Sequence, residues 1–251
     1  MSAESRGRVR VEQSAKRVRV VFGGRVIADS TRPLLVWEVP YYPMYYLPRA
    51  DVQTDVLVPG SGTRPSPSRG EGRLFHVKVG DREAADAALD YPDSPLEQVQ
   101  DHIRFDWAAM DAWFEEDEEI FTHPRNPYTR LDILASARRV RVEVDGVTVA
   151  DSTSPRLLFE TGLPTRYYLP KTDVRLDLLE SSEKVTHCPY KGTTEYFSVR
   201  VGERLHPDLA WSYSTPLPES QKIAGLVCFS DEHVDVYVDG VLQERPKTPF
   251  S

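Results

Sequence analysis

The chain of 251 residues is long enough for one large domain or two of ordinary size, and 40% hydrophobic with 28% charged residues is typical of a globular protein. Its formal net charge of -8 disfavours a nucleic-acid partner, because phosphate binding needs clustered Lys and Arg. No apolar stretch approaches the roughly 18 residues that cross a membrane, which predicts no membrane partner. Two cysteines and no apolar leader favour reduced thiols in the cytoplasm.

The sequence repeats itself at an offset of 122 positions, because residues 17–20 recur as residues 139–142. Four further pairs of segments keep the same offset: 28–31 with 150–153, 45–48 with 167–170, 51–55 with 173–177, and 77–80 with 199–202. A single offset held over this span indicates two copies of one module, each of normal domain size. We expect a first module at 1–122, a connector containing prolines at 123–137, and a second module at 138–251.

Each copy is predicted to be a run of short strands. Residues 18–30 alternate apolar and polar side chains around Gly23-Gly24, and the second copy has Asp145-Gly146 there, which indicates a β-hairpin. Further strands are predicted at 34–39, 45–48, 157–160, 196–201 and 211–213, with a final strand pair of 226–229 and 234–238. A short helix capped by Thr172 is predicted over 173–181, and one helical turn over 218–224.

These elements predict a mainly β fold: two tandem copies of a small, closed or folded-over β-sheet module with short helical turns. The acidic run at 115–119 is predicted to be a solvated face or turn. The duplication favours a monomer with an internal pseudo-twofold, or a weak homodimer.

Residues 187–192 concentrate the most chemistry, with the thiol of Cys188, the phenol of Tyr190, the cation of Lys191 and the flexible Gly192. Nearby positive charge raises the fraction of thiolate, which a nucleophilic cysteine needs, so Cys188 is a candidate nucleophile and otherwise a half-buried structural thiol. Lys191 and Gly192 favour contact with an anion, although no P-loop motif is present. Tyr190, Tyr196, Trp211 and Tyr213 are candidates to line an aromatic pocket, or belong to a plain core. Polar groups that could converge on such a pocket come from Arg166, Tyr167, Tyr168 and Lys171. Cys228 lies in an apolar strand and is predicted to be core.

The two copies differ at this stretch. Cys188 corresponds to Ser66, and Trp211 to Leu89, whereas Tyr213 keeps its counterpart in Tyr91. We therefore expect the fuller site in the second module and a degenerate site in the first. The competing interpretation is that the first module supplies a complementary half, with Arg69 as a second anion-binding cation. The six histidines share no metal-ligand spacing, so no metal site is predicted.

The sequence also resembles a known family over nearly its whole length. The motifs that carry the resemblance are residues 150–152, 168–170, 188–192, 196, 210–213 and 223–225, with residues 105–116 and 123–128 typical of a two-module form. They are similar to the domain-of-unknown-function family numbered four hundred and twenty-seven, in its tandem form. The resemblance implies a compact, tent-like β fold and carries a nucleotidyltransferase-like heading.

The functional hypothesis is an uncharacterised protein that binds a small anionic or aromatic metabolite beside residues 188–196, with enzymatic activity left open. One alternative is a non-catalytic scaffold or interaction module. The other is nucleotidyl transfer, which needs clustered carboxylates for Mg²⁺. The identity of any cofactor is left open. The predicted catalytic residues are Cys188 and Lys191, and the predicted ligand-binding residues are Tyr168, Tyr190, Gly192, Tyr196, Trp211, Tyr213, Arg69 and Tyr91.

Overall fold

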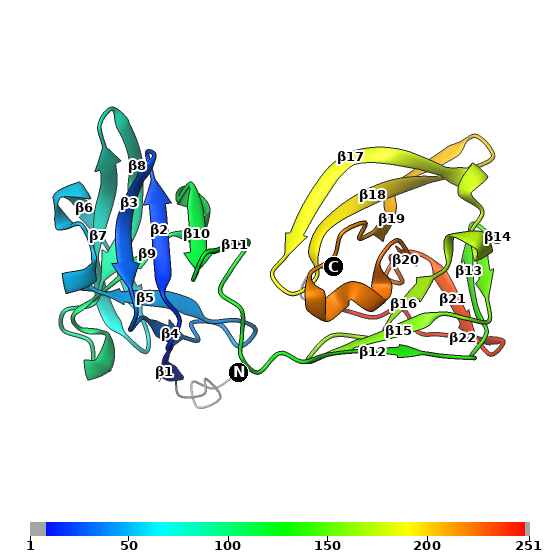
Figure 1. The fold of residues 1–251 in the computed structure, drawn as a ribbon, viewed down its shortest axis with the longest axis horizontal. Coiled ribbons are helices and arrows are strands. Elements are labelled where there is room, and N and C mark those ends of the chain that lie inside the picture. The colour runs from blue at the N-terminus through cyan, green and yellow to red at the C-terminus, as the bar shows by residue number, and fades with distance from the viewer. Residues whose placement is uncertain (1–8, 249–251) are drawn as a thin grey trace. The chain divides into compact units, whose positions relative to one another are not determined.

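A computed structural model describes residues 9–248. The chain divides between Asn126 and Pro127 into two compact units, and each contains one seven-stranded and one four-stranded antiparallel sheet (Figure 1). The prediction of a mainly β protein in two copies is confirmed. The sheets are open within the described residues, because each strand order runs from one edge to another, so the barrel-like alternative is wrong.

The seven-stranded sheet of the first unit has the order β1 (Val11–Gln13), β4 (Leu34–Val36), β5 (Met44–Pro48), β9 (His102–Phe105), β8 (Arg82–Asp90), β7 (Gly70–Val79) and β6 (Leu57–Ser66). Its four-stranded sheet has the order β11 (Glu118–Ile120), β10 (Ala112–Glu115), β2 (Val18–Phe22) and β3 (Arg25–Ser30). Short 3-10 turns connect the strands: η2 (Arg49–Asp51), η3 (Thr54–Val56), η4 (Glu97–Val99) and η5 (Trp107–Ala109).

The second unit repeats both strand orders. Its seven-stranded sheet runs β12 (Leu131–Ala135), β15 (Arg156–Glu160), β16 (Arg166–Leu169), β20 (Val227–Phe229), β19 (Arg204–Ser212), β18 (Gly192–Val201) and β17 (Leu179–Cys188). Its four-stranded sheet runs β14 (Val147–Ser152), β13 (Val140–Val144), β21 (Asp235–Val238) and β22 (Val241–Leu242). The turns are η6 (Lys171–Asp173), η7 (Leu176–Leu178) and η8 (Pro218–Ile223).

The register confirms the repeat and shows where it slips. Leu47 pairs with Ile103 and Leu169 pairs with Val227, so the offset is 122 on one strand and 124 on the other. The extra residues lie after β19, in the segment that contains η8 in the second unit. The units therefore share one topology and differ in the length of the segment between β19 and β20 and its counterpart between β8 and β9.

The predicted hairpins form as the turn residues require. Gly23 and Gly24 both have positive φ, as do Asp145 and Gly146, which is the backbone of a tight two-residue turn. The prediction that 226–229 pairs with 234–238 is wrong, since these strands lie in different sheets. β20 pairs with β16 and β19, whereas β21 pairs with β13 and β22. Each of β20 and β21 therefore has a partner that lies far away in the sequence, and the two do not pair with each other.

The predicted helix over 173–181 is also wrong. Val174 is extended, with φ -115° and ψ 136°. It bridges Ala150, and the Asp173 carboxylate accepts a hydrogen bond of 2.6 Å from Ser152 Oγ. The bridge and the hydrogen bond connect this segment to β14 and keep its backbone extended at Val174. Only the short turns η6 and η7 therefore form, and no side chain caps η6.

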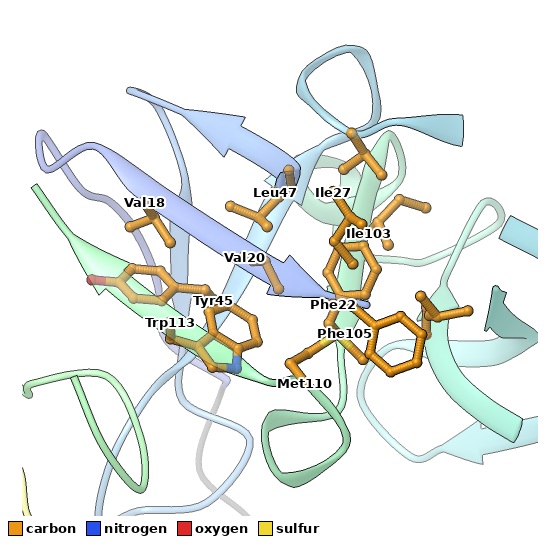
Figure 2. Close-up of a cluster of buried hydrophobic side chains, with 14 of the residues drawn as sticks. Val18, Val20, Phe22, Ile27, Tyr45, Leu47, Ile103, Phe105, Met110 and Trp113 are labelled. Atoms are coloured by element: carbon orange, nitrogen blue, oxygen red, sulfur yellow. The ribbon is translucent and has the colours of Figure 1, made fainter. Parts of the chain in front are cut away.

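The main core of each unit lies between its two sheets. Alternate residues of β2 are buried in the first unit, and the same positions of β13 are buried in the second. Figure 2 shows this cluster in the first unit, where Val18, Val20 and Phe22 face Tyr45, Leu47, Ile103, Phe105, Met110 and Trp113. The acidic run is partly inside, because Glu115 is buried and accepts a hydrogen bond from Tyr45 Oη. The prediction of a wholly solvated run is therefore wrong at Glu115.

All five residues of β5 are buried, so this strand is covered on both faces. Tyr45 and Leu47 point to the main core, while Met44 and Tyr46 belong to a second, smaller cluster. The second unit repeats the division, with Leu169 in the main core and Tyr168 in the smaller cluster. Each seven-stranded sheet thus has a packed outer face, which contains the predicted site residues.

Candidate functional site

The outer face of the second unit is covered by its own chain. In Figure 1, β17 and β18 (yellow) arch over the coil of η8 (orange), with β15 and β12 on its other side. Lys222 Nζ donates to Ile133 O of β12 at 3.1 Å, and Ser220 Oγ donates to Tyr190 O at 3.3 Å. The η8 segment therefore joins one edge strand of the curled sheet to the turn that ends the other.

The aromatic residues form one row across this face. Strand register places Tyr196 opposite Trp211, Trp211 opposite Cys228, and Cys228 opposite Tyr168. The Trp211 indole donates to Tyr168 Oη at 3.2 Å, and the rings of Tyr196 and Trp211 lie 6.2 Å apart. The structure thus brings together Tyr168, Tyr196 and Trp211. Tyr168 is buried, whereas Tyr196 and Trp211 are half-buried.

Lys191 lies in the turn between β17 and β18 and forms an ion pair with Glu160. Its side chain is 12% exposed, and that of Glu160 is 8% exposed. Burial works to lower the pKa of Lys191, but Cys188 and Glu160 raise it above its ordinary value, so the ammonium stays charged. Cys188 is half-buried and pairs with Gly192 at the end of β17 and β18. The structure brings Cys188 and Lys191 together as predicted.

Three further predicted residues have structural surroundings. Tyr213 is buried, and burial, followed by Tyr168 and Cys188, raises its pKa. Tyr190 is buried, and its carbonyl accepts the bond from Ser220. Gly192 has a φ of 98°, and an added Cβ would lie 3.4 Å from Leu217 N, so glycine suits the turn. Tyr213 thus packs within the cluster rather than facing an open pocket.

Cys228 is buried, as predicted, and burial raises its pKa to about 12. It is therefore protonated and packed, unlike Cys188, which reaches the surface.

The structure assigns partners to two charged groups, of which Glu160 was missed by reading the sequence and Arg166 was named only as one of several polar groups near the pocket. Glu160 balances Lys191, and the signal for it was a glutamate at the same offset in both copies, Glu38 and Glu160. Arg166 forms ion pairs with Asp231 and Glu232, and its guanidinium lies 5.6 Å from the centre of the Trp211 ring. Met44 occupies the position of Arg166 in the first unit, since Val36 pairs with Met44 and Leu158 with Arg166. Arg166 is therefore specific to the second unit.

The first unit carries an equivalent cluster with different chemistry. Arg69, at the position of Lys191, lies near Glu38, the equivalent of Glu160. Tyr46 Oη donates to Glu38 at 2.6 Å, and the Arg69 guanidinium lies 5.3 Å from the centre of the buried Tyr91 ring. The predicted pair Arg69 and Tyr91 is thus in contact. A cation, a glutamate and two tyrosines occupy the same places in both units.

Residues 9–248 contain neither a metal-binding cluster nor a membrane-spanning helix. In that part of the chain, no group of three or more His, Cys, Asp or Glu side chains is arranged to hold a metal ion. Over the same residues, no helix has the length and apolar character to cross a membrane.

Two β-sheet units with one topology and one repeated polar cluster define a duplicated, mainly β protein. The chain belongs to the family described as domain of unknown function (DUF427), whose model matches it twice, at residues 10–116 and 132–240. The name of the model labels the family as nucleotidyltransferase-like. No curated protein matches the chain. The predicted resemblance, including its tandem form, is confirmed.

Proposed function

We propose that the second unit binds a small aromatic or anionic metabolite on the open side of its cluster, beside Cys188 and Tyr196. The observation that carries this proposal is that two half-buried aromatic rings, Tyr196 and Trp211, lie next to each other and each has a cation beside it. Lys184 Nζ lies 4.6 Å from the centre of the Tyr196 ring, and Arg166 lies 5.6 Å from that of Trp211. Alternating rings and cations suit a ligand that carries both a flat group and an acidic group.

Cys188 and Lys191 give this site its capacity for chemistry. Lys191 keeps its proton and lies next to the thiol, so a negative charge that develops on sulfur during a reaction has a cation beside it. Cys188 is the candidate nucleophile, and Lys191 is the group that stabilises its charge. Glu160 holds Lys191 in place, so a ligand does not need to order it on binding.

Nucleotidyl transfer receives no support from the carboxylates. That reaction depends on acidic side chains that hold Mg²⁺ between phosphate oxygens. In the described part of the chain, no three acidic, histidine or cysteine side chains form such a group. We therefore rank ligand binding, with or without covalent chemistry at Cys188, above nucleotidyl transfer.

A thermal-shift screen of the full chain against aromatic acids and nucleotides tests the proposal. A ligand at about a hundred times its Kd adds about 2.7 kcal/mol to the stability of the folded state. We expect the shift to fall in Lys184→Gln and Cys188→Ser, and to persist in Lys78→Gln, which removes an exposed lysine of the first unit. A library with no hit, together with an unreactive Cys188, would favour the non-catalytic interaction module.

A further inference from the structure

Two arginine side chains of the first unit share one carboxylate. Arg69 Nη1 lies 3.7 Å from Glu38 Oε1, and Arg104 Nε lies 3.6 Å from the same oxygen. That oxygen also accepts the hydrogen bond from Tyr46. The arginine side chains are 12% and 13% exposed, so both guanidinium groups are largely removed from water.

The charges and hydrogen bonds of this cluster do not balance. Among the described residues, Glu38 is the one carboxylate in ion-pair contact with either guanidinium, which leaves one positive charge in excess. Arg69 Nε, Arg69 Nη1 and Arg104 Nε are buried and have no hydrogen-bond partner. Buried donors without partners are unfavourable, and native proteins usually satisfy them with protein groups, water or a ligand.

The excess charge is specific to the first unit. Leu89 pairs with Arg104, and the equivalent Trp211 pairs with Cys228, so a neutral thiol replaces the second cation. In the second unit one lysine faces one glutamate. The first unit therefore keeps the shared framework of glutamate and tyrosines but carries an additional guanidinium.

We propose that Arg69 and Arg104 form a binding site for a small oxyanion, a phosphate or carboxylate group. A guanidinium presents a planar fork of N–H donors that matches the oxygens of either group. Glu38 and the Tyr91 ring position the forks. The slight exposure of both side chains admits a single oxyanionic group at the surface. The first unit therefore has a site of its own, in place of the degenerate site expected from its sequence.

Isothermal titration of the full chain with inorganic phosphate, and separately with acetate, at constant ionic strength, tests this site. We expect saturable binding of at least one anion, and a loss of about tenfold or more in its affinity in Arg104→Leu. Arg82→Leu, which removes an exposed arginine paired with Asp111, should keep the wild-type affinity. The anion that binds more tightly shows whether the site recognises a phosphate or a carboxylate group. No saturable binding of either anion, or equal binding by Arg104→Leu, would overturn the proposal.

Thermal unfolding without added anion gives a second readout. Because Arg104 contributes the excess charge, its replacement by leucine should leave the melting temperature unchanged or raised when no anion is present. A lower melting temperature with unchanged anion affinity would make Arg104 a structural residue and reject the site. If Arg104→Leu fails to fold, Arg69→Lys serves instead, since lysine occupies that position in the second unit, and weaker anion binding is expected. Modification of Cys188 should be unaffected by these variants, which separates this test from that of the second unit.

Discussion

The two units place the same framework on the same face of a curled sheet but surround it with different charges. Glu160 ends β15 and Glu38 follows the end of the equivalent β4, and Tyr46 and Tyr168 lie beside them. In the first unit, two guanidinium groups lie close to the glutamate. In the second unit, a single ammonium group pairs with the glutamate and lies next to a thiol. The sheet therefore fixes where a polar cluster forms, and a few side chains determine its net charge and reactivity.

Removal of the shared glutamate should have the largest effect and should differ between units. Breaking a buried ion pair from one side typically costs about 3–5 kcal/mol. We expect Glu38→Gln to reach this range, because guanidinium groups cannot lose a proton. Glu160→Gln should cost less, because Lys191 can become neutral. Urea unfolding measures both free energies.

Tryptophan fluorescence separates the two transitions. Three of the four tryptophans, Trp37, Trp107 and Trp113, belong to the first unit, and Trp211 belongs to the second. A Trp211→Phe background therefore reports the first unit alone. Equal losses for Glu38→Gln and Glu160→Gln would contradict the charge difference between the clusters.

Acid should weaken the second unit through Glu232. Burial works to raise the pKa of Glu232, but hydrogen bonds, chiefly from Arg166, lower it from 4.5 to about 2. Its folded pKa is depressed, so its stabilisation is present above pH 4.5 and is lost as the pH falls toward 2. The difference corresponds to about 2–3 kcal/mol.

Unfolding of wild type and Glu232→Gln, compared at about pH 5 and about pH 2.5, measures this term. The variant should be less stable only at the higher pH. The first unit should not respond to the substitution, because Met44 stands where Arg166 stands in the second. A stability difference that persists at low pH would show that Glu232 acts through packing rather than charge.

The turns that close the two clusters should respond alike and more weakly. Gly70 has a φ of 87° and Gly192 a φ of 98°, where an L-residue is strained. Alanine at either position should cost about 1–3 kcal/mol, because these φ values exceed those of the left-handed helical region. Gly80→Ala and Gly202→Ala are the matched comparisons and should cost less, about 1 kcal/mol, since their φ values of 57° and 58° lie within that region and a Cβ there meets open space. Larger losses at these controls would remove the special role assigned to the cluster turns.

The repeat and the turn residues were sufficient to predict the duplicated β fold. A constant offset locates equivalent strands, and residues such as Asp145-Gly146 act locally to form a hairpin. Partner choice for β20 and β21 was not predictable in the same way. Both are short apolar strands close in sequence, yet each pairs with strands far along the chain. Local patterns carry no information on such register.

The site was predicted in part for the same reason. Residues 188–192 are adjacent in sequence, so their thiol, cation and glycine were visible as one group. Glu38 and Arg104 are far apart in sequence and meet only in the fold. Likewise, Glu115 belongs to an acidic run that reads as solvated, but Tyr45 and Lys16 bind it at the end of β10. Contacts of this kind depend on the packed sheets.

The central claim is that Lys191 supports an accessible thiol in the second unit, and native-state alkylation measures this most directly. Folded protein is treated with iodoacetamide, and modification of Cys188 and Cys228 is followed by mass spectrometry. We predict that Cys188 reacts while buried Cys228 does not. In the charge-balanced double variant Glu160→Gln with Lys191→Gln, the reaction of Cys188 should slow by about tenfold. Protection of Cys188 until urea exposes both thiols, or an unchanged rate in the double variant, would contradict the account.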